Sequence, residues 1–130
     1  MRLWHEDLLS FLPRAQLLGQ HRECCALRGL SWGKKHAVVD YVFSHPPEYL
    51  IVYHLRVMME MARRGYRAEP KWASPPYRGR RCSPWSINAA RIAALAGRRP
   101  VYPEHDRQYL EECLDNLRKK GISLSIGQSE

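Results

Sequence analysis

Three stretches of the chain repeat apolar side chains at the three- and four-residue spacing of an amphipathic α-helix. They cover residues 13–28, residues 46–65 and a stretch that ends at residues 119–121. The second stretch has Ser44 near its start and closes on basic side chains and a glycine, as the negative end of a helix dipole and a left-handed cap favour. Its apolar stripe is Leu50, Ile51, Leu55, Met58 and Met61, and that of the third is Tyr109, Leu110, Cys113, Leu114 and Leu117. The pattern predicts three main helices.

The segments between these stretches carry weaker patterns. A β-branched and aromatic run at residues 38–43 is compatible with a short strand, but no second run is available to pair with it, which favours a connector or short helix. Residues 66–81 lack apolar periodicity and mix Pro, Arg, Lys, Tyr and Trp, so they predict a loop. A shorter Ala-rich helix is expected over residues 83–96, closed by Gly97, and a loosely held tail is expected after residue 121.

These elements predict an all-α fold: a compact single-domain bundle of three main helices plus a shorter helix, with long basic loops. The 130 residues form one predicted domain, 1–130, because the chain is too short for two independent cores. No apolar run reaches membrane-spanning length, and the first residues carry acids where a signal peptide needs an apolar stretch. A cytoplasmic protein with no membrane partner is expected.

Charge and cysteine content limit the binding partners and cofactors to be expected. A net charge of +8 predicts a positive surface field, which attracts nucleic acid, anionic membranes or acidic proteins. The four cysteines form no Cys-x-x-Cys pair, and adjacent Cys24 and Cys25 would give only a strained disulfide, so all four are interpreted as reduced thiols. The histidines and cysteines show no metal-ligand spacing, and neither a metal nor another cofactor is expected.

One helical stripe of the first stretch carries a candidate catalytic group. Gln16, Gln20 and Glu23 lie three and four residues apart, and His21 and Arg22 flank the carboxylate. An acid able to accept a proton, set among groups that attract phosphate, suggests chemistry on a polyanion. The ordinary alternative is a solvated helix face with a weak ion pair.

A family resemblance favours the catalytic interpretation. Met1-Arg2-Leu3-Trp4, followed about twenty residues later by Gln20-His21-Arg22-Glu23, resembles the pyrimidine-dimer DNA glycosylase family of the phage endonuclease V type. Residues 36–66 and 102–105 are similar to later helices of that family. Two features depart from it: Ala26 stands where the family has an arginine, with Arg28 nearest, and residues 122–127 lack the family's aromatic C-terminal segment.

The resemblance implies a DNA repair glycosylase and AP lyase that needs no metal. Its nucleophile would be the α-amine of Met1, which forms an imine with the sugar, and Glu23 would be the second catalytic group. The expected partner is double-stranded DNA containing damaged bases or abasic sites, bound by a monomer. The residues expected to contact phosphate are Arg2, His21, Arg22, Arg28, Lys34 and Lys35, with the loop 71–81 as a weaker addition.

Two other function classes fit the same composition. A non-catalytic, basic nucleic-acid-binding module explains the charge, the helices and the aromatic basic loop without any role for Met1 or Glu23. A small interaction protein with an acidic partner explains the charge alone. Neither class predicts the pairing of Met1-Arg2-Leu3-Trp4 with Gln20-His21-Arg22-Glu23 downstream.

Overall fold

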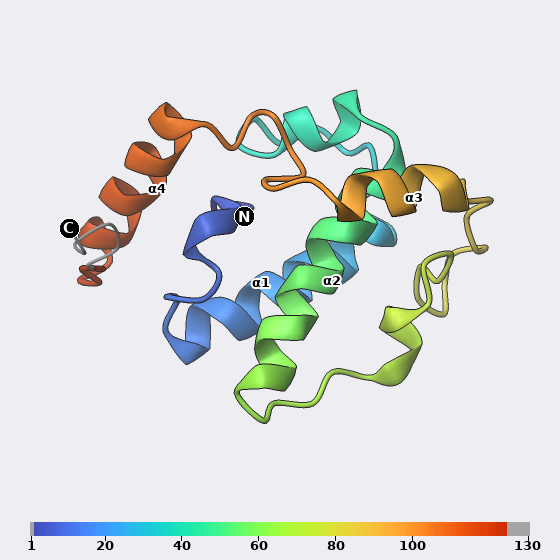
Figure 1. Cartoon of the computed structure of the whole chain (residues 1–130), viewed down its shortest axis with the longest axis horizontal. Helices are drawn as coiled ribbons and strands as arrows, with labels where there is room; N and C mark the ends of the chain where they lie inside the picture. The colour runs from blue at the N-terminus through green and yellow to red at the C-terminus, as the bar shows by residue number, and fades with distance from the viewer. Residues whose placement is uncertain (1, 125–130) are drawn as a thin grey trace.

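The computed structural model describes residues 2–124, and Met1 and residues 125–130 lie outside the described part. Most of the predicted tail therefore falls outside it. The described chain is all helical and contains no strand, which confirms the predicted fold class (Figure 1). Its α-helices are α1 (Arg14–Arg28), α2 (Pro47–Arg63), α3 (Ala89–Ala96) and α4 (Arg107–Lys119), and its short 3-10 helices are η1 (Glu6–Leu8), η2 (Asp40–Ser44) and η3 (Pro70–Ala73).

The centre of the molecule is the pair α1 and α2. Helix α3 also packs on α2, and the N-terminal segment lies between the central pair and α4 (Figure 1). This segment belongs to the core, because Leu3 and Leu8 are fully buried and Trp4 is nearly so. Burying large apolar side chains contributes about 1.5–3 kcal/mol each. The first residues of the chain are therefore held by the same hydrophobic effect that holds the helices.

The ends of α1 and α2 follow the sequence signals with small corrections. Pro13 occupies the N-cap of α1 rather than its first turn. The cap of α2 is Pro46, and Ser44 instead ends η2. Gly65 has φ +84°, as the left-handed cap requires. Gly29, the C-cap of α1, does not have a positive φ, but a Cβ there would lie 3.0 Å from the carbonyl oxygen of Arg78, and this close approach favours glycine.

Of two connecting segments, one follows the sequence prediction and the other departs from it. The run at residues 38–43 forms no strand, and η2 covers most of it, which confirms the favoured connector or short helix. The Ala-rich helix starts at residue 89, six residues later than predicted, because the side chain of Asn88 accepts the amide of Arg91 and caps it. The Asn88 amide in turn donates to Glu48 of α2 at 2.8 Å, which ties the start of α3 to the core.

None of the described helices combines the length and the apolar character needed to cross a bilayer. The four cysteines are free thiols, as predicted, and Cys24 and Cys113 are buried.

Candidate active site

Glu23 lines a surface pocket of about 350 Å³. The pocket lies where the N-terminal segment, α1, the loop after α1 and the end of α4 meet. Residues that line it include Arg2, Trp4, Gln20, Glu23, His36 and Lys120. Two cationic side chains from opposite ends of the chain, Arg2 and Lys120, thus share a pocket with a carboxylate. Such a pocket suits an anionic ligand that must undergo proton transfer.

Gln20 fixes the position of the N-terminal segment beside Glu23. Its side chain is fully buried, and its Oε1 accepts the amide of Trp4 at 2.6 Å. Its Nε2 donates to the carbonyl of Arg2 at 2.9 Å and lies 3.2 Å from Glu23 Oε1. The hydroxyl of Tyr53, from α2, lies 2.9 Å from Gln20 Oε1. One amide side chain therefore joins the start of the chain, the candidate acid and the second helix.

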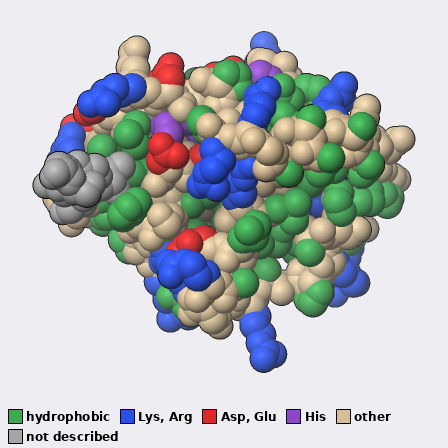
Figure 2. Space-filling view, in the orientation of Figure 1, with side chains coloured by type: hydrophobic (Ala, Val, Ile, Leu, Met, Phe, Trp, Pro, Cys, Tyr) green, Lys and Arg blue, Asp and Glu red, His purple; other side chains and the backbone are tan. Residues whose placement is uncertain are grey.

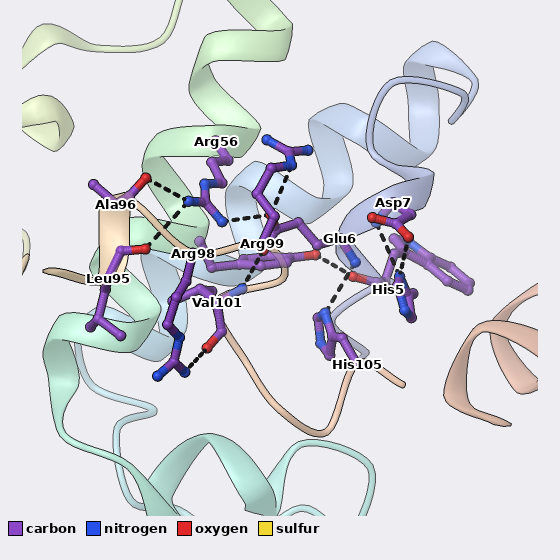
Figure 3. A network of polar contacts seen from close by, with 12 residues as sticks. His5, Glu6, Asp7, Arg56, Leu95, Ala96, Arg98, Arg99, Val101 and His105 are labelled. Atoms are coloured by element: carbon purple, nitrogen blue, oxygen red, sulfur yellow. Dashed lines mark hydrogen bonds and ion pairs between the residues drawn. The ribbon is translucent and has the colours of Figure 1, made fainter. Parts of the chain in front are cut away.

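A second polar network holds the same segment from its other side (Figure 3). The carboxylate of Glu6 is buried, accepts from Arg56 at 2.6 Å and accepts the amide of Val101 at 2.8 Å. The Glu6 amide donates to Nδ1 of His105 at 3.0 Å. Because a buried ion pair with further hydrogen bonds has a demanding geometry, this network specifies where η1 lies on α2. The N-terminal segment thus enters the site from a fixed position.

The environment of Glu23 favours its protonated form. Burial raises the pKa of the Glu23 carboxyl, and the backbone amide of Arg2 and the charge of Arg22 oppose that shift without cancelling it. A carboxylate with a raised pKa is a stronger base than one in water. Glu23 is therefore able to accept a proton at the pocket wall and to release it again.

The predicted phosphate-binding residues divide by exposure. Arg2 is half-buried, and its guanidinium lies 5.8 Å from the ring centre of Tyr109. Arg22, Lys34 and Lys35 are exposed and accessible to a polyanion. Of these four residues, only Arg2 lines the pocket of Glu23.

Arg28 does not lie at the phosphate surface where the sequence analysis placed it. Its side chain is fully buried. The guanidinium donates to the carbonyl oxygens of four residues in one loop, at 2.8–3.2 Å: Trp72, Ser74, Pro75 and Tyr77. Five N–H donors in a rigid fork make arginine suitable for gathering several carbonyls. Arg28 therefore organises the segment from η3 to Tyr77, and its buried guanidinium is not exposed to a DNA phosphate.

His21 faces α2 rather than the pocket of Glu23. Its Nδ1 lies 2.8 Å from Nε2 of His54, and the Cys25 thiol lies within 4 Å of both rings. The expectation that the histidines and cysteines show no metal-ligand spacing was wrong in one place. His21 and Cys25 stand one helical turn apart, and His54 completes a group of three possible ligand atoms within 4.8 Å of one another. A spacing of four residues on a helix was the available signal, but the third member comes from α2.

Sequence reasoning also missed contributors from outside α1. Lys120 and Asn116 reach the pocket from α4, and His36 reaches it from the loop. Lys120 was visible only as part of a basic helix end, and nothing local indicates that this end meets the first residues of the chain. The basic side chains do not gather in one block on the face shown in Figure 2, where they alternate with apolar patches.

Comparison with known proteins identifies a family for the chain. The sequence profile of the family described as pyrimidine dimer DNA glycosylase matches residues 1–74, more than half of the chain. The matched part contains the N-terminal segment, Gln20 and Glu23, whereas α3 and α4 lie beyond it. No curated protein sequence and no solved structure matches the chain significantly. The chain belongs to the pyrimidine dimer DNA glycosylase family, a family of DNA repair enzymes that acts on damaged DNA.

Proposed function

We propose that the protein removes damaged bases from duplex DNA through an imine with its N-terminal α-amine and then cleaves the strand as an AP lyase. Pyrimidine dimers are the proposed lesion, with abasic sites as a second substrate. The observation that carries this proposal is the contact of Gln20 with both Arg2 and Glu23. It puts the second residue of the chain next to the carboxylate of the pocket.

The position of Arg2 supports an amine nucleophile. Gln20 Nε2 donates to the carbonyl oxygen of Arg2 and lies 3.2 Å from Glu23 Oε1, so the backbone of the second residue stands beside the carboxylate. An α-amine has a reference pKa of about 7.7–8.0, which leaves a useful neutral fraction at physiological pH. The proposal requires that the mature chain begins at Met1, which lies outside the described residues.

The proposed reaction proceeds in two stages. The amine lone pair attacks the sugar C1′, and the bond from C1′ to the base breaks with its electron pair on the base. The nitrogen then loses a proton, its lone pair breaks the C1′–O4′ bond of the sugar ring, and O4′ takes up a proton, which leaves an imine at C1′. The imine acidifies the hydrogens at C2′. Glu23 takes one of these protons, the electrons form a C2′–C3′ double bond, and the 3′ phosphate leaves. Water then hydrolyses the imine and frees the amine.

The accessible cations supply the binding that this chemistry needs. Reaching C1′ means extruding a nucleotide, at a cost of about a few kcal/mol. Arg2, Arg22, Lys34, Lys35 and Lys120 are among the cations that could neutralise phosphates and offset that cost.

Borohydride trapping tests the proposal. Protein with a native N-terminus is incubated with duplexes carrying a thymine dimer or an abasic site, reduced, and compared with N-terminally acetylated protein and with Glu23→Gln. The expected adduct forms with the native protein, disappears on acetylation and contains the N-terminal peptide by mass spectrometry. Glu23→Gln is expected to lower strand cleavage by about 10²-fold or more.

Glu111→Gln is the matched control, because it removes an exposed carboxylate on α4. It is expected to leave trapping and cleavage at the wild-type level. Duplex binding without any adduct or cleavage would overturn the proposal and favour the non-catalytic binding module.

A further inference from the structure

A buried chain of polar contacts runs across the interface between α1 and α2. Arg28 Nη1 lies 3.0 Å from His54 Nδ1, and His54 Nε2 lies 2.8 Å from His21 Nδ1. Arg28 and His54 are fully buried, and His21 is half-buried. No step proposed for Glu23 uses this chain, which lies on the face of α1 toward α2.

The chemistry of arginine determines which group donates at each hydrogen bond from Arg28 through His54 to His21. A guanidinium only donates hydrogen bonds, so His54 Nδ1 accepts from Arg28 and carries no proton. Neutral His54 then has its proton on Nε2, where it donates to His21 Nδ1. His21 in turn has its proton on Nε2. Each ring is thus held in the Nε2–H tautomer by the group before it.

The same arrangement of donors and acceptors disfavours metal binding by His21, Cys25 and His54. A cation in this group would need the lone pair of His54 Nε2, and the proton would have to move to Nδ1, against the N–H of Arg28. The guanidinium charge lies in contact with His54 and would repel the cation in a buried setting. Burial also raises the pKa of the Cys25 thiol to about 11, which disfavours the thiolate ligand.

We propose that Arg28 and His54 are positioning residues that hold His21 as a neutral donor, with its Nε2–H available to a phosphate oxygen of bound DNA. The neighbour that the structure gives this nitrogen is Cys25 Sγ at 3.8 Å, which is a weak acceptor. The donor therefore retains capacity for an outside partner, and exposed Arg22 follows it in the chain. The phosphate part of this inference rests on the DNA binding of the proposed function, whereas the tautomers do not.

Long-range ¹H–¹⁵N NMR of the ¹⁵N-histidine-labelled full chain at pH 7 measures the tautomers directly. The expected spectra show Nδ1 unprotonated and Nε2 protonated in both His21 and His54. The signals are assigned with His21→Phe and His54→Phe. The tautomers themselves are measured in the wild-type protein, so the result stands even if one variant does not fold. A proton on Nδ1 of His54, or a doubly protonated His54, would contradict the proposed tautomers.

Cobalt(II) and zinc titrations test the competing site. The expected result is no cobalt–thiolate absorption band and unchanged histidine spectra with excess zinc. Cys25→Ser is the matched control, because it removes the thiolate but leaves the Arg28–His54–His21 contacts in place. A band that appears in the wild type and is lost in Cys25→Ser would show a metal site and overturn the proposal.

Affinity for an undamaged duplex tests the phosphate contact without requiring catalysis. We expect His21→Phe and His54→Phe each to weaken binding about tenfold, and the double variant to be no weaker than either. Inorganic phosphate at the same concentration of phosphate groups should not shift His21 Nε2, while the duplex should. Additive losses, or no loss in His21→Phe, would overturn the positioning role. An intact chain of tautomers with no duplex binding by the wild type would locate the failure in the proposed function.

Discussion

Buried polar residues, more than exposed charges, determine the geometry around Glu23. Gln20 illustrates this, because its single amide satisfies donors and acceptors from the N-terminal segment, α2 and Glu23 itself. Leaving a buried donor without a partner costs about 1–3 kcal/mol. A residue of similar size without the amide oxygen and nitrogen would fill the space. It would not hold the N-terminal segment in its position beside Glu23.

Gln20→Leu is therefore expected to lower the free energy of unfolding by about 1–3 kcal/mol, since the buried amide of Trp4 loses its acceptor. Strand cleavage should fall further than stability alone explains, because Arg2 is no longer tied beside Glu23. Urea unfolding and cleavage of an abasic duplex measure the two effects. Gln108→Leu, at an exposed position of α4, is the control, and an equal loss in both variants would contradict this role of Gln20.

His105 makes stability depend on pH. Burial, helped by the nearby charge of His5, lowers the pKa of His105 to about 3, and its Nδ1 already accepts the Glu6 amide. Below about pH 6.5 the unfolded chain takes up a proton that the native chain refuses until about pH 3, so stability falls as pH falls through this window. His105 alone should remove about 2 kcal/mol between pH 7 and pH 5.

Urea unfolding at pH 7, 6 and 5 measures this decline. His105→Gln should be less stable at pH 7 yet show a shallower decline, because one proton-linked group is gone. A variant that declines as steeply as the wild type would show that other groups carry the acid sensitivity.

At the scale of elements, local sequence signals predicted the positions of α1 and α2 well. The ends of α1 and α2 fell within a residue or two of the prediction, since apolar periodicity and glycine stops act within one turn. The start of α3 was predicted wrongly because the cap was placed at residue 83, whereas the side chain of Asn88 caps the helix through the amide of Arg91. The burial of the apolar side chains of the N-terminal segment was not visible either, since a short segment has no periodicity to show which side faces the core. These side chains are Leu3, Trp4, Leu8, Leu9 and Leu12.

The glycines that follow two helices give a matched test of backbone conformation. Gly65 has φ +84°, so Gly65→Ala should lower the free energy of unfolding by about 1–2 kcal/mol. Gly97 has φ −86°, and a Cβ there would lie 3.6 Å from the carbonyl oxygen of Ala94, an ordinary contact, so Gly97→Ala should change stability by less than about 0.5 kcal/mol. Thermal and urea unfolding measure both. Equal effects would show that Gly65 does not keep this backbone conformation in solution.

At the scale of the whole molecule, the site joins parts of the chain that are far apart in sequence. The motif around Glu23 could be read locally, but Lys120 and Asn116 join it only because α4 packs beside the N-terminal segment, where the Tyr109 hydroxyl donates to the carbonyl of Leu3. Such contacts depend on the complete fold, and no short stretch encodes them. The same reasoning explains why Arg28, in a basic stretch, proved to be buried.

The net charge of +8 predicts duplex binding that weakens steeply with salt, and the fold predicts which lysine takes part. Lys120 lines the pocket of Glu23, whereas neighbouring Lys119 pairs with Asp115 at 3.4 Å. Lys120→Gln should weaken binding and reduce the slope of log affinity against log salt by about 0.9, the value for one phosphate contact, and Lys119→Gln should change it less. Fluorescence anisotropy over a range of salt concentrations measures both slopes. If the two variants changed the slope equally, duplex binding would depend only on the overall charge of the protein. The duplex backbone would then not lie at the pocket beside Glu23.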